Sequence, residues 1–247
     1  MAGALADYDR VLELHPNQPN VLTVRGNVKM DLGDVPGAIE DYSRSLDLLP
    51  LQPHVFLLRA ILRGRTGDAA GAISDFDSAL QLEPGRSEIR GLRGLQKMRI
   101  GDILGALPDF DAALNAKPDS VSFLANRGLA KTYLERFAEA IWDFDRALEL
   151  DPQNAEVLAY RGEVKIQAGD RLGARLDSEQ ALQLNPKGFI AAYNLAALAA
   201  REGRTEEALD FLRQALAVRP GLSGKARTDR NFEPLRDRPE FLDITKP

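Results

Sequence analysis

The chain has 247 residues, of which 44% are apolar and 28% are charged, so it can form a substantial hydrophobic core. Its formal charge of -5 is a poor match to the phosphates of nucleic acid and gives no reason to expect binding to anionic membranes. The absence of cysteine excludes disulfides and thiolate metal sites, and no apolar run approaches the length of a membrane span.

The N-terminal segment, residues 1–16, predicts one amphipathic helix that ends at a proline. This proline is the first of a series at intervals of 34 residues. An alanine stands twelve residues before each proline, and an aromatic residue stands eight before each of the first five. The prolines are Pro16, Pro50, Pro84, Pro118, Pro152, Pro186 and Pro220. Such a fixed period indicates a repeat protein whose neighbouring units share one core.

Each repeat after residue 16 predicts two helices. The segment before each proline is apolar at helical spacing, and the proline ends that helix because it lacks an N–H. The helix that follows each proline carries a small residue through which a neighbouring helix can approach closely. Between the helices, pairs such as Gly33-Asp34 predict a helix end followed by an N-cap. The small residues are Gly26, Ala60, Gly94, Gly128, Gly162 and Ala196.

These columns, at a period of 34 residues, resemble the tetratricopeptide repeat. The resemblance implies an all-α fold, a right-handed superhelical solenoid of antiparallel helix pairs with a concave groove. It implies an N-terminal half repeat at residues 1–16, which supplies only the second helix of a pair. Six full repeats would follow, at residues 17–50, 51–84, 85–118, 119–152, 153–186 and 187–220.

The two ends of the array depart from this period. The half repeat has no first helix to cover it, which indicates either that the chain continued upstream or that a second protomer covers the helix. The C-terminal segment, residues 221–247, resembles the end-of-group segment that follows some bacterial tetratricopeptide arrays. We expect it to form a short capping helix that packs Phe232, Leu235 and Phe241 against the last pair.

Five repeats carry an arginine just before the small residue and an aspartate sixteen positions later. An arginine removed from water needs a hydrogen-bonded anion, so we predict a charge pair between the two helices of each repeat. The sixth repeat replaces both residues, with Leu195 and Phe211. The predicted pairs are Arg25 with Asp41, Arg59 with Asp75, Arg93 with Asp109, Arg127 with Asp143, and Arg161 with Asp177.

A second base follows four residues after each of these arginines. We interpret this column as a solvated edge whose like charges mildly disfavour the helix, with acidic residues of the second helices able to offset it. The bases are Lys29, Arg63, Lys97, Lys131 and Lys165, and the acids are Asp77, Asp111, Asp145 and Glu179.

The sequence shows no pattern that predicts catalysis or a cofactor. The two histidines, His15 and His54, are isolated from each other and make no convincing metal site without cysteine. The carboxylates are explained by helix caps, by the charge pairs and by solvated faces. We therefore expect a protein that is not an enzyme and binds no cofactor.

The resemblance places the binding surface on one face of the first helices. A strip that mixes aliphatic residues with tyrosines suits an extended peptide or an amphipathic helix, although half of these side chains could instead pack adjacent helices. The lysine and asparagine pattern with which some family members clamp a terminal carboxylate is absent. The predicted groove contains Asn27, Leu57, Ile61, Leu95, Met98, Leu129, Tyr133, Glu156, Tyr160, Glu163, Ile166, Tyr193 and Asn194.

These observations favour a cytoplasmic protein-interaction scaffold whose partner is a protein or peptide, with no nucleic acid and no membrane insertion. Two alternatives remain open. The array could be the C-terminal specificity or regulatory region of a larger enzyme whose catalytic domain lies upstream. It could also be a self-association module that forms a homo-oligomer through the uncovered N-terminal half repeat.

Overall fold

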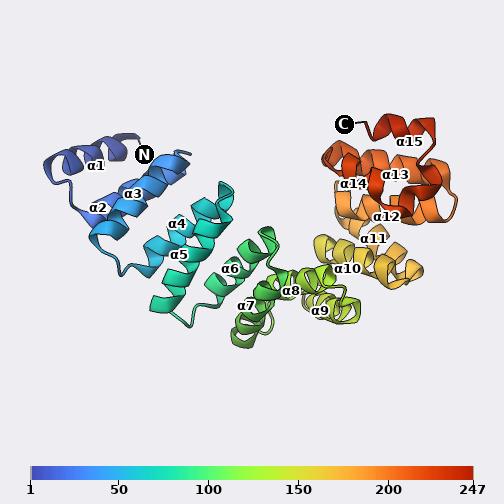
Figure 1. Ribbon diagram of the computed structural model, residues 1–247, viewed down its shortest axis with the longest axis horizontal. Coiled ribbons are helices and arrows are strands. Elements are labelled where there is room, and N and C mark those ends of the chain that lie inside the picture. Colours follow the sequence, from blue (N-terminus) through green and yellow to red (C-terminus); the bar gives the residue numbers. More distant parts are fainter. Residues whose placement is uncertain (1, 247) are drawn as a thin grey trace. The chain divides into compact units, whose positions relative to one another are not determined.

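The computed structural model describes residues 2–246, and every regular element in that range is helical (Figure 1). The all-α fold expected from the sequence is therefore confirmed. Within this range, no helix has both the length and the hydropathy needed to cross a membrane. The elements are α1 (Ala2–Leu14), α2 (Pro19–Asp31), α3 (Val35–Leu48), α4 (Pro53–Arg65), α5 (Ala69–Leu82), α6 (Ser87–Arg99), α7 (Ile103–Ala116), α8 (Val121–Tyr133), α9 (Phe137–Leu150), α10 (Ala155–Ala168), α11 (Arg171–Leu184), α12 (Phe189–Arg201), α13 (Thr205–Val218), α14 (Leu222–Thr228), the 3-10 helix η1 (Arg230–Leu235) and α15 (Pro239–Ile244).

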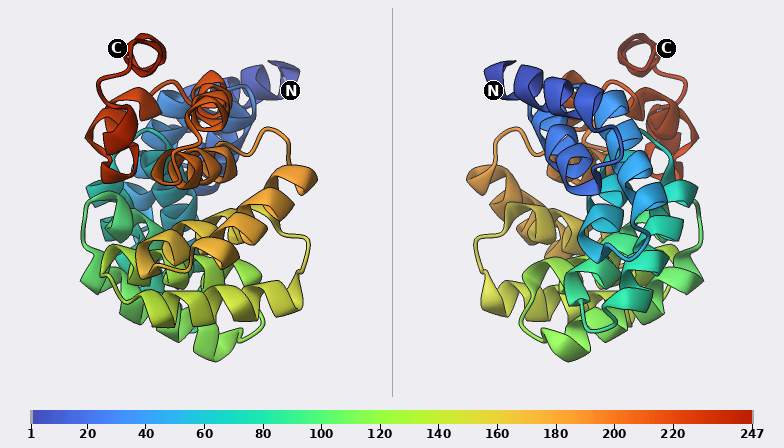
Figure 2. Two further views of the ribbon diagram at one scale, coloured as in Figure 1. Left: turned by 90° about the vertical axis from the view of Figure 1, so that its right-hand side faces the viewer. Right: turned by 90° about the vertical axis from the view of Figure 1, so that its left-hand side faces the viewer.

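The chain forms two compact units, residues 1–118 and 119–247. In the N-terminal unit, α1 packs on α2, and the pairs α2–α3, α4–α5 and α6–α7 stack in chain order. In the C-terminal unit, the pairs α8–α9, α10–α11 and α12–α13 stack in the same way, and the short helices of the tail follow. The helices of one pair run in opposite directions, as Figures 1 and 2 show for each unit separately.

The turns inside the pairs are set by a glycine and an aspartate. Gly33 has a φ of 84°, in the left-handed region that glycine enters without strain, and it follows the last turn of α2. Asp34 then caps α3, because its carboxylate accepts the Gly37 N–H at 3.0 Å. The fourth repeat lacks this pair, and Glu135 takes the left-handed conformation there, with a φ of 57°.

The core of each of the first four pairs, from α2–α3 to α8–α9, is an aromatic ring packed under a small residue. Tyr42, Phe76, Phe110 and Phe144 are all essentially inaccessible to solvent. A Cβ atom added at Gly128 would lie 2.8 Å from Cε1 of Phe144, so the close approach of α8 to α9 requires a glycine in this packing.

The tail differs from the single capping helix that we expected, because it forms three short segments, α14, η1 and α15. Pro239 stands at the first position of α15, and the extended conformation of the preceding Arg238 separates α15 from η1, whereas Pro234 lies inside η1. Phe232, Leu235 and Phe241 are nonetheless buried in one cluster with residues of α12 and α13. The Phe232 ring lies edge-on to Tyr193, with 5.3 Å between their centroids.

Candidate functional site

Each predicted pair of an arginine and an aspartate forms hydrogen bonds. The guanidinium of Arg25 donates from Nε and Nη2 to the two carboxylate oxygens of Asp41, at 2.8 and 2.6 Å. The same two-point contact recurs between Arg59 and Asp75, Arg93 and Asp109, Arg127 and Asp143, and Arg161 and Asp177. All five aspartates are buried.

The second base of each repeat is not the solvated edge that we expected. It binds the same aspartate as the arginine: Lys131 Nζ lies 2.7 Å from Oδ2 of Asp143, for example. Each aspartate is thus shared by two bases, because residues four apart on a helix project from one face. The corresponding contacts are Lys29 with Asp41, Arg63 with Asp75, Lys97 with Asp109, and Lys165 with Asp177, at 2.8 to 2.9 Å.

The acidic column on the second helices also has a different role from the one predicted. Asp77 accepts a hydrogen bond from Nη1 of Arg93 at 2.6 Å, and Asp145 does so from Arg161 at 2.6 Å. These acids therefore pair with the arginine of the following repeat, whose first helix packs against their own helix, and not with the second base of their own repeat.

Together these contacts form a charge ladder that occupies its own donors and acceptors. The hydrogen bond to Asp41 raises the pKa of Arg25 against the opposing effect of burial, so this base stays charged. Among the described residues, no buried side-chain nitrogen or oxygen lacks a hydrogen-bond partner. The ladder therefore offers no vacant charge for a ligand, and the candidate site lies elsewhere.

The predicted groove residues of the N-terminal unit are half-buried between helices. Leu57 and Ile61 of α4 pack against the cluster that contains Phe76. Leu95 and Met98 of α6 are likewise half-buried. The side-chain carbonyl of Asn27 accepts the hydroxyl of Tyr42 at 2.7 Å. Much of the strip in this unit thus packs the repeats together.

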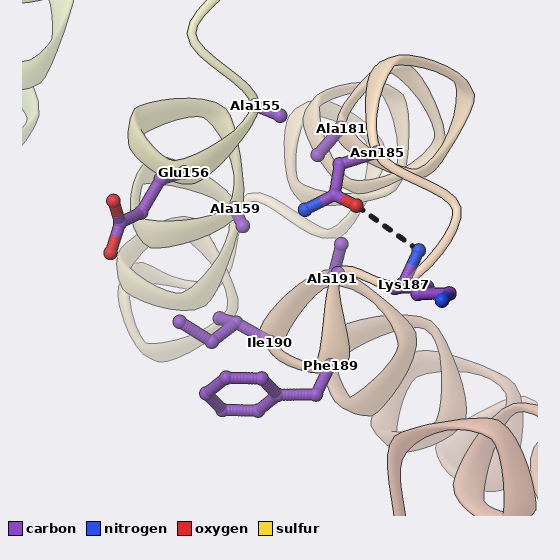
Figure 3. A pocket seen from close by; sticks show the side chains of 10 residues that line it. Ala155, Glu156, Ala159, Ala181, Asn185, Lys187, Phe189, Ile190 and Ala191 are labelled. Carbon is purple, nitrogen blue, oxygen red and sulfur yellow. Dashed lines mark hydrogen bonds between the residues drawn. The ribbon is translucent and has the colours of Figure 1, made fainter. Parts of the chain in front are cut away.

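The first helices of the C-terminal unit border two adjoining cavities. The first, of about 510 Å³, lies between α8 and α10 and is lined by the predicted residues Leu129, Glu156 and Tyr160. The second, of about 310 Å³, lies where the starts of α10 and α12 meet the end of α11 (Figure 3). Glu156 borders both cavities. Tyr133, 70% exposed, lies outside both of these linings.

Two predicted groove residues are buried and cannot serve as free polar groups. Asn194 is 2% exposed, and its amide donates to the Ala159 carbonyl at 2.8 Å. Tyr193 is 6% exposed, and its hydroxyl donates to Asp229 of the tail at 3.0 Å. Both are held because the sixth repeat is covered by its neighbour α10 on one side and by the tail on the other.

The tail also reaches the remaining predicted residues, Glu163 and Ile166. Lys225 of α14 lies 3.3 Å from the carboxylate of Glu163 and 5.1 Å from the ring centroid of Tyr193. A small cavity of about 200 Å³ remains between α10, α12 and the tail, and Ile166 lines it. The tail therefore borders the face of the first helices beyond the two larger cavities.

Comparison with known proteins identifies the repeat. A family model described as tetratricopeptide repeat matches residues 23–87, 92–155 and 161–223. The chain belongs to the tetratricopeptide repeat family. The match ends at residue 223, so the resemblance of the tail to an end-of-group segment stays a prediction. No curated protein sequence matches the chain significantly.

Solved tetratricopeptide structures share the fold at low sequence identity. A tetratricopeptide repeat protein from Parabacteroides merdae has a TM-score of 0.72 and 17% identity, over 87% of this chain and 85% of its own. The C-terminal part of a repeat protein from Cytophaga hutchinsonii has a TM-score of 0.67 and 16% identity, over 95% and 94%. YrrB, a TPR protein with an unusual peptide-binding site, has a TM-score of 0.64 and 16% identity, over 74% and 95%.

Several residues of the smaller cavity escaped the sequence analysis. Ala181 and Asn185 come from the end of a second helix, whereas family resemblance directs attention to the first helices. A signal did exist in the first position of each tetratricopeptide first helix, where Ala155 stands in the column that holds Val121 and Phe189. A small residue between two large ones leaves space beside the next repeat.

Proposed function

We propose that this tetratricopeptide protein is an interaction scaffold that binds a peptide or an amphipathic helix on the first helices of its C-terminal unit. The observation that supports this role is the pair of adjoining cavities along α8, α10 and α12. Their volumes, about 510 and 310 Å³, fall within the range of about 300 to 1,000 Å³ that is usual for ligand sites.

The exposure of the lining residues is consistent with that proposal. Leu129 and Tyr160 are only half-buried, so each keeps apolar surface that a partner can cover. The charge ladder holds the same helices in place through buried two-point contacts, which gives the surface a rigid support. A scaffold needs no catalytic group, and the tetratricopeptide fold typically serves binding.

A display library of random peptides, selected on the immobilised full chain, tests this function. Peptides that are enriched would be synthesised with a fluorophore and measured by fluorescence polarisation. We expect Leu129→Lys, which places a long charged side chain at the larger cavity, to weaken binding at least about tenfold.

Leu172→Lys provides the matched control, because Leu172 is 71% exposed on α11 and lines neither cavity. The control should bind like the unmodified chain. Equal binding by the folded Leu129→Lys variant would exclude this face as the binding surface.

A further inference from the structure

The smaller cavity presents an almost continuous apolar wall. Ala155 and Ala159 of α10, Ala181 of α11, and Ala191 and Ile190 of α12 line it. Figure 3 shows their side chains surrounding one space, with Ile190 directed toward α10. At about 310 Å³, the space is larger than the engineered cavity of about 150 Å³ that holds benzene in another protein. It has room for one large aliphatic or aromatic side chain.

The polar groups beside this cavity include one neutral amide. The carbonyl oxygen of the Asn185 side chain accepts the Lys187 backbone N–H at 3.1 Å, and its NH2 group is directed toward α10 in Figure 3. In Figure 3, Lys187 and the carboxylate of Glu156 lie on opposite sides of the cavity, both directed away from its centre. The cavity therefore selects for apolar surface and not for charge.

The larger cavity has the opposite character. Its lining includes two carboxylates, Asp151 and Glu156, and no lysine, arginine or histidine. Tyr160 donates its hydroxyl to Glu156 at 2.7 Å, and Asn154 donates its amide to Asp151 at 2.9 Å. These neutral donors leave the negative charge of both carboxylates in place. A cation in this cavity would gain from both charges.

The next acid along α10 has a basic partner. Glu163, about two turns beyond Glu156, is offset by Lys225 of the tail at 3.3 Å. The two uncompensated carboxylates thus lie directly beside the apolar cavity, with Glu156 as the shared border.

We infer that the partner is an extended peptide that inserts a large apolar side chain into the alanine-lined cavity and a lysine or arginine into the acidic one. This inference rests on the proposed function and specifies the chemistry of its ligand. Because the cavities adjoin and an extended chain advances about 3.3 Å per residue, the two side chains should lie within about three positions of each other.

The same display selection, read for sequence pattern, provides the first test. The enriched peptides should carry Leu, Ile, Phe or Met within about three positions of Lys or Arg, since that separation matches neighbouring cavities. The best peptide is then measured by fluorescence polarisation against two variants of the full chain.

The first variant fills the apolar cavity. Ala155→Phe uses the residue that Phe189 supplies in the same column of the next repeat, so the helix start tolerates it elsewhere in the chain. We expect Kd to rise at least about tenfold. A peptide whose apolar residue is changed to Ala should bind the unmodified chain and the filled variant equally weakly.

The second variant, Asp151→Asn with Glu156→Gln, removes two charges at nearly constant shape. We expect Kd to rise about tenfold for the basic peptide but to change little for the same peptide with Gln in place of Lys or Arg. Glu40→Gln with Asp47→Asn is the matched control, because it changes net charge equally at two exposed positions of α3. This near-isosteric pair keeps the inference testable if the filled variant does not fold.

The outcomes separate the inference from the function on which it rests. Enriched peptides that lose binding to Leu129→Lys but lack the apolar and basic pattern, or bind both variants of the cavities normally, would overturn the inference and leave the proposed function intact. A selection that enriches no peptide, or only peptides indifferent to Leu129→Lys, would overturn both.

Discussion

The last helix pair and the five before it differ in the side chains that join their two helices: charged in the five earlier pairs and apolar in the last. In the earlier repeats, a buried aspartate joins an arginine and a second base across the pair, as Asp143 does for Arg127 and Lys131. In the last repeat, the corresponding residues are Leu195, Ala199 and Phe211. Leu195 is 1% exposed and packs in a cluster with Phe211 at its edge.

All three positions change together in the last repeat, which is what the energetics of buried charge predict. Removing one member of a buried charge cluster leaves the others desolvated and unpaired, whereas replacing the whole cluster with apolar residues is often neutral. The acid of the preceding helix, Glu179, is then left without an arginine on α12. It lies 3.7 Å from Arg175 of its own helix, which also contacts Glu202 and Glu207 of the last repeat.

The largest effect should come from removing the shared aspartate of one repeat from the charge ladder. Asp143→Leu would leave Arg127 and Lys131 facing an apolar side chain, and both bases are at least four-fifths buried at the side chain. We expect the free energy of unfolding to fall by about 3 to 5 kcal/mol. Urea denaturation of the full chain measures this fall. A loss below about 1 kcal/mol would show that the contacts of Asp143 contribute no more stability than a surface ion pair does.

An effect of similar or slightly smaller size is expected where the last repeat depends on the tail. Phe232 is fully buried, and its ring contacts Tyr193 and Phe241. Phe232→Ala should lower the free energy of unfolding by about 3 to 4 kcal/mol through lost burial and a residual cavity. Leu242→Ala is the matched control, because Leu242 is 48% exposed on α15 and should change stability little. Equal urea midpoints for the two variants would contradict the proposed importance of the tail.

The difference between the last repeat and the earlier ones can be tested by placing the apolar residues of the last repeat in an earlier repeat. The triple variant Arg127→Leu, Lys131→Ala, Asp143→Phe copies the three residues of the last repeat into the fourth. We expect it to be more stable than Asp143→Leu by about 2 kcal/mol or more, because no buried charge is left unpaired. If the urea midpoint of the triple variant is no higher than that of Asp143→Leu, the charged and the apolar residue sets are not interchangeable.

A smaller effect is expected at the aromatic column, where the first full repeat has a tyrosine in place of phenylalanine. Tyr42→Phe removes the hydroxyl that Asn27 accepts at 2.7 Å, and leaves that half-buried carbonyl without this donor. We expect a loss of about 1 kcal/mol, measured by urea denaturation at pH 7. Phe76, in the same column, shows that the ring alone fits this packing.

The same residue predicts a pH dependence. Burial raises the pKa of Tyr42 from the ordinary value of 10.0 to about 12, so the folded state holds the proton more tightly than the unfolded state does. This contribution to stability is complete below pH 10 and is lost as the pH rises toward 12. Tyr42→Phe should therefore lose less stability than the unmodified chain between pH 10 and 12, and a steeper loss in the variant would contradict the assignment.

Much of the fold was predictable because nearly the same residues recur at the helix ends and in the core of each repeat. The prolines and the Gly–Asp turns set the helix ends, and the spacing of sixteen residues between Arg127 and Asp143 matched two antiparallel helices. The second base was misread because like charges at that spacing repel in an isolated helix, and only the packed pair supplies a shared aspartate. The pattern of one repeat also could not show which neighbour covers Asn194.

The candidate site was less predictable than the fold. Leu129 and Tyr160 followed from their place on the first helices, but the predicted residues of the N-terminal unit are half-buried between helices instead. The alanine-lined cavity depends on what adjacent repeats leave unfilled, as at Ala155, and such space is a property of three helices together. The sequence pattern of a single helix cannot reveal such a space.

The most direct test of the binding surface is a methyl NMR titration of the full chain with an enriched peptide. If the cavities receive the peptide, the methyl resonances of Leu129, Ala155 and Ala159 should shift most, and those of Leu172 and Leu176, exposed on α11, should remain in place. The largest shifts at Leu172 and Leu176, with Ala155 and Ala159 unchanged, would contradict the account.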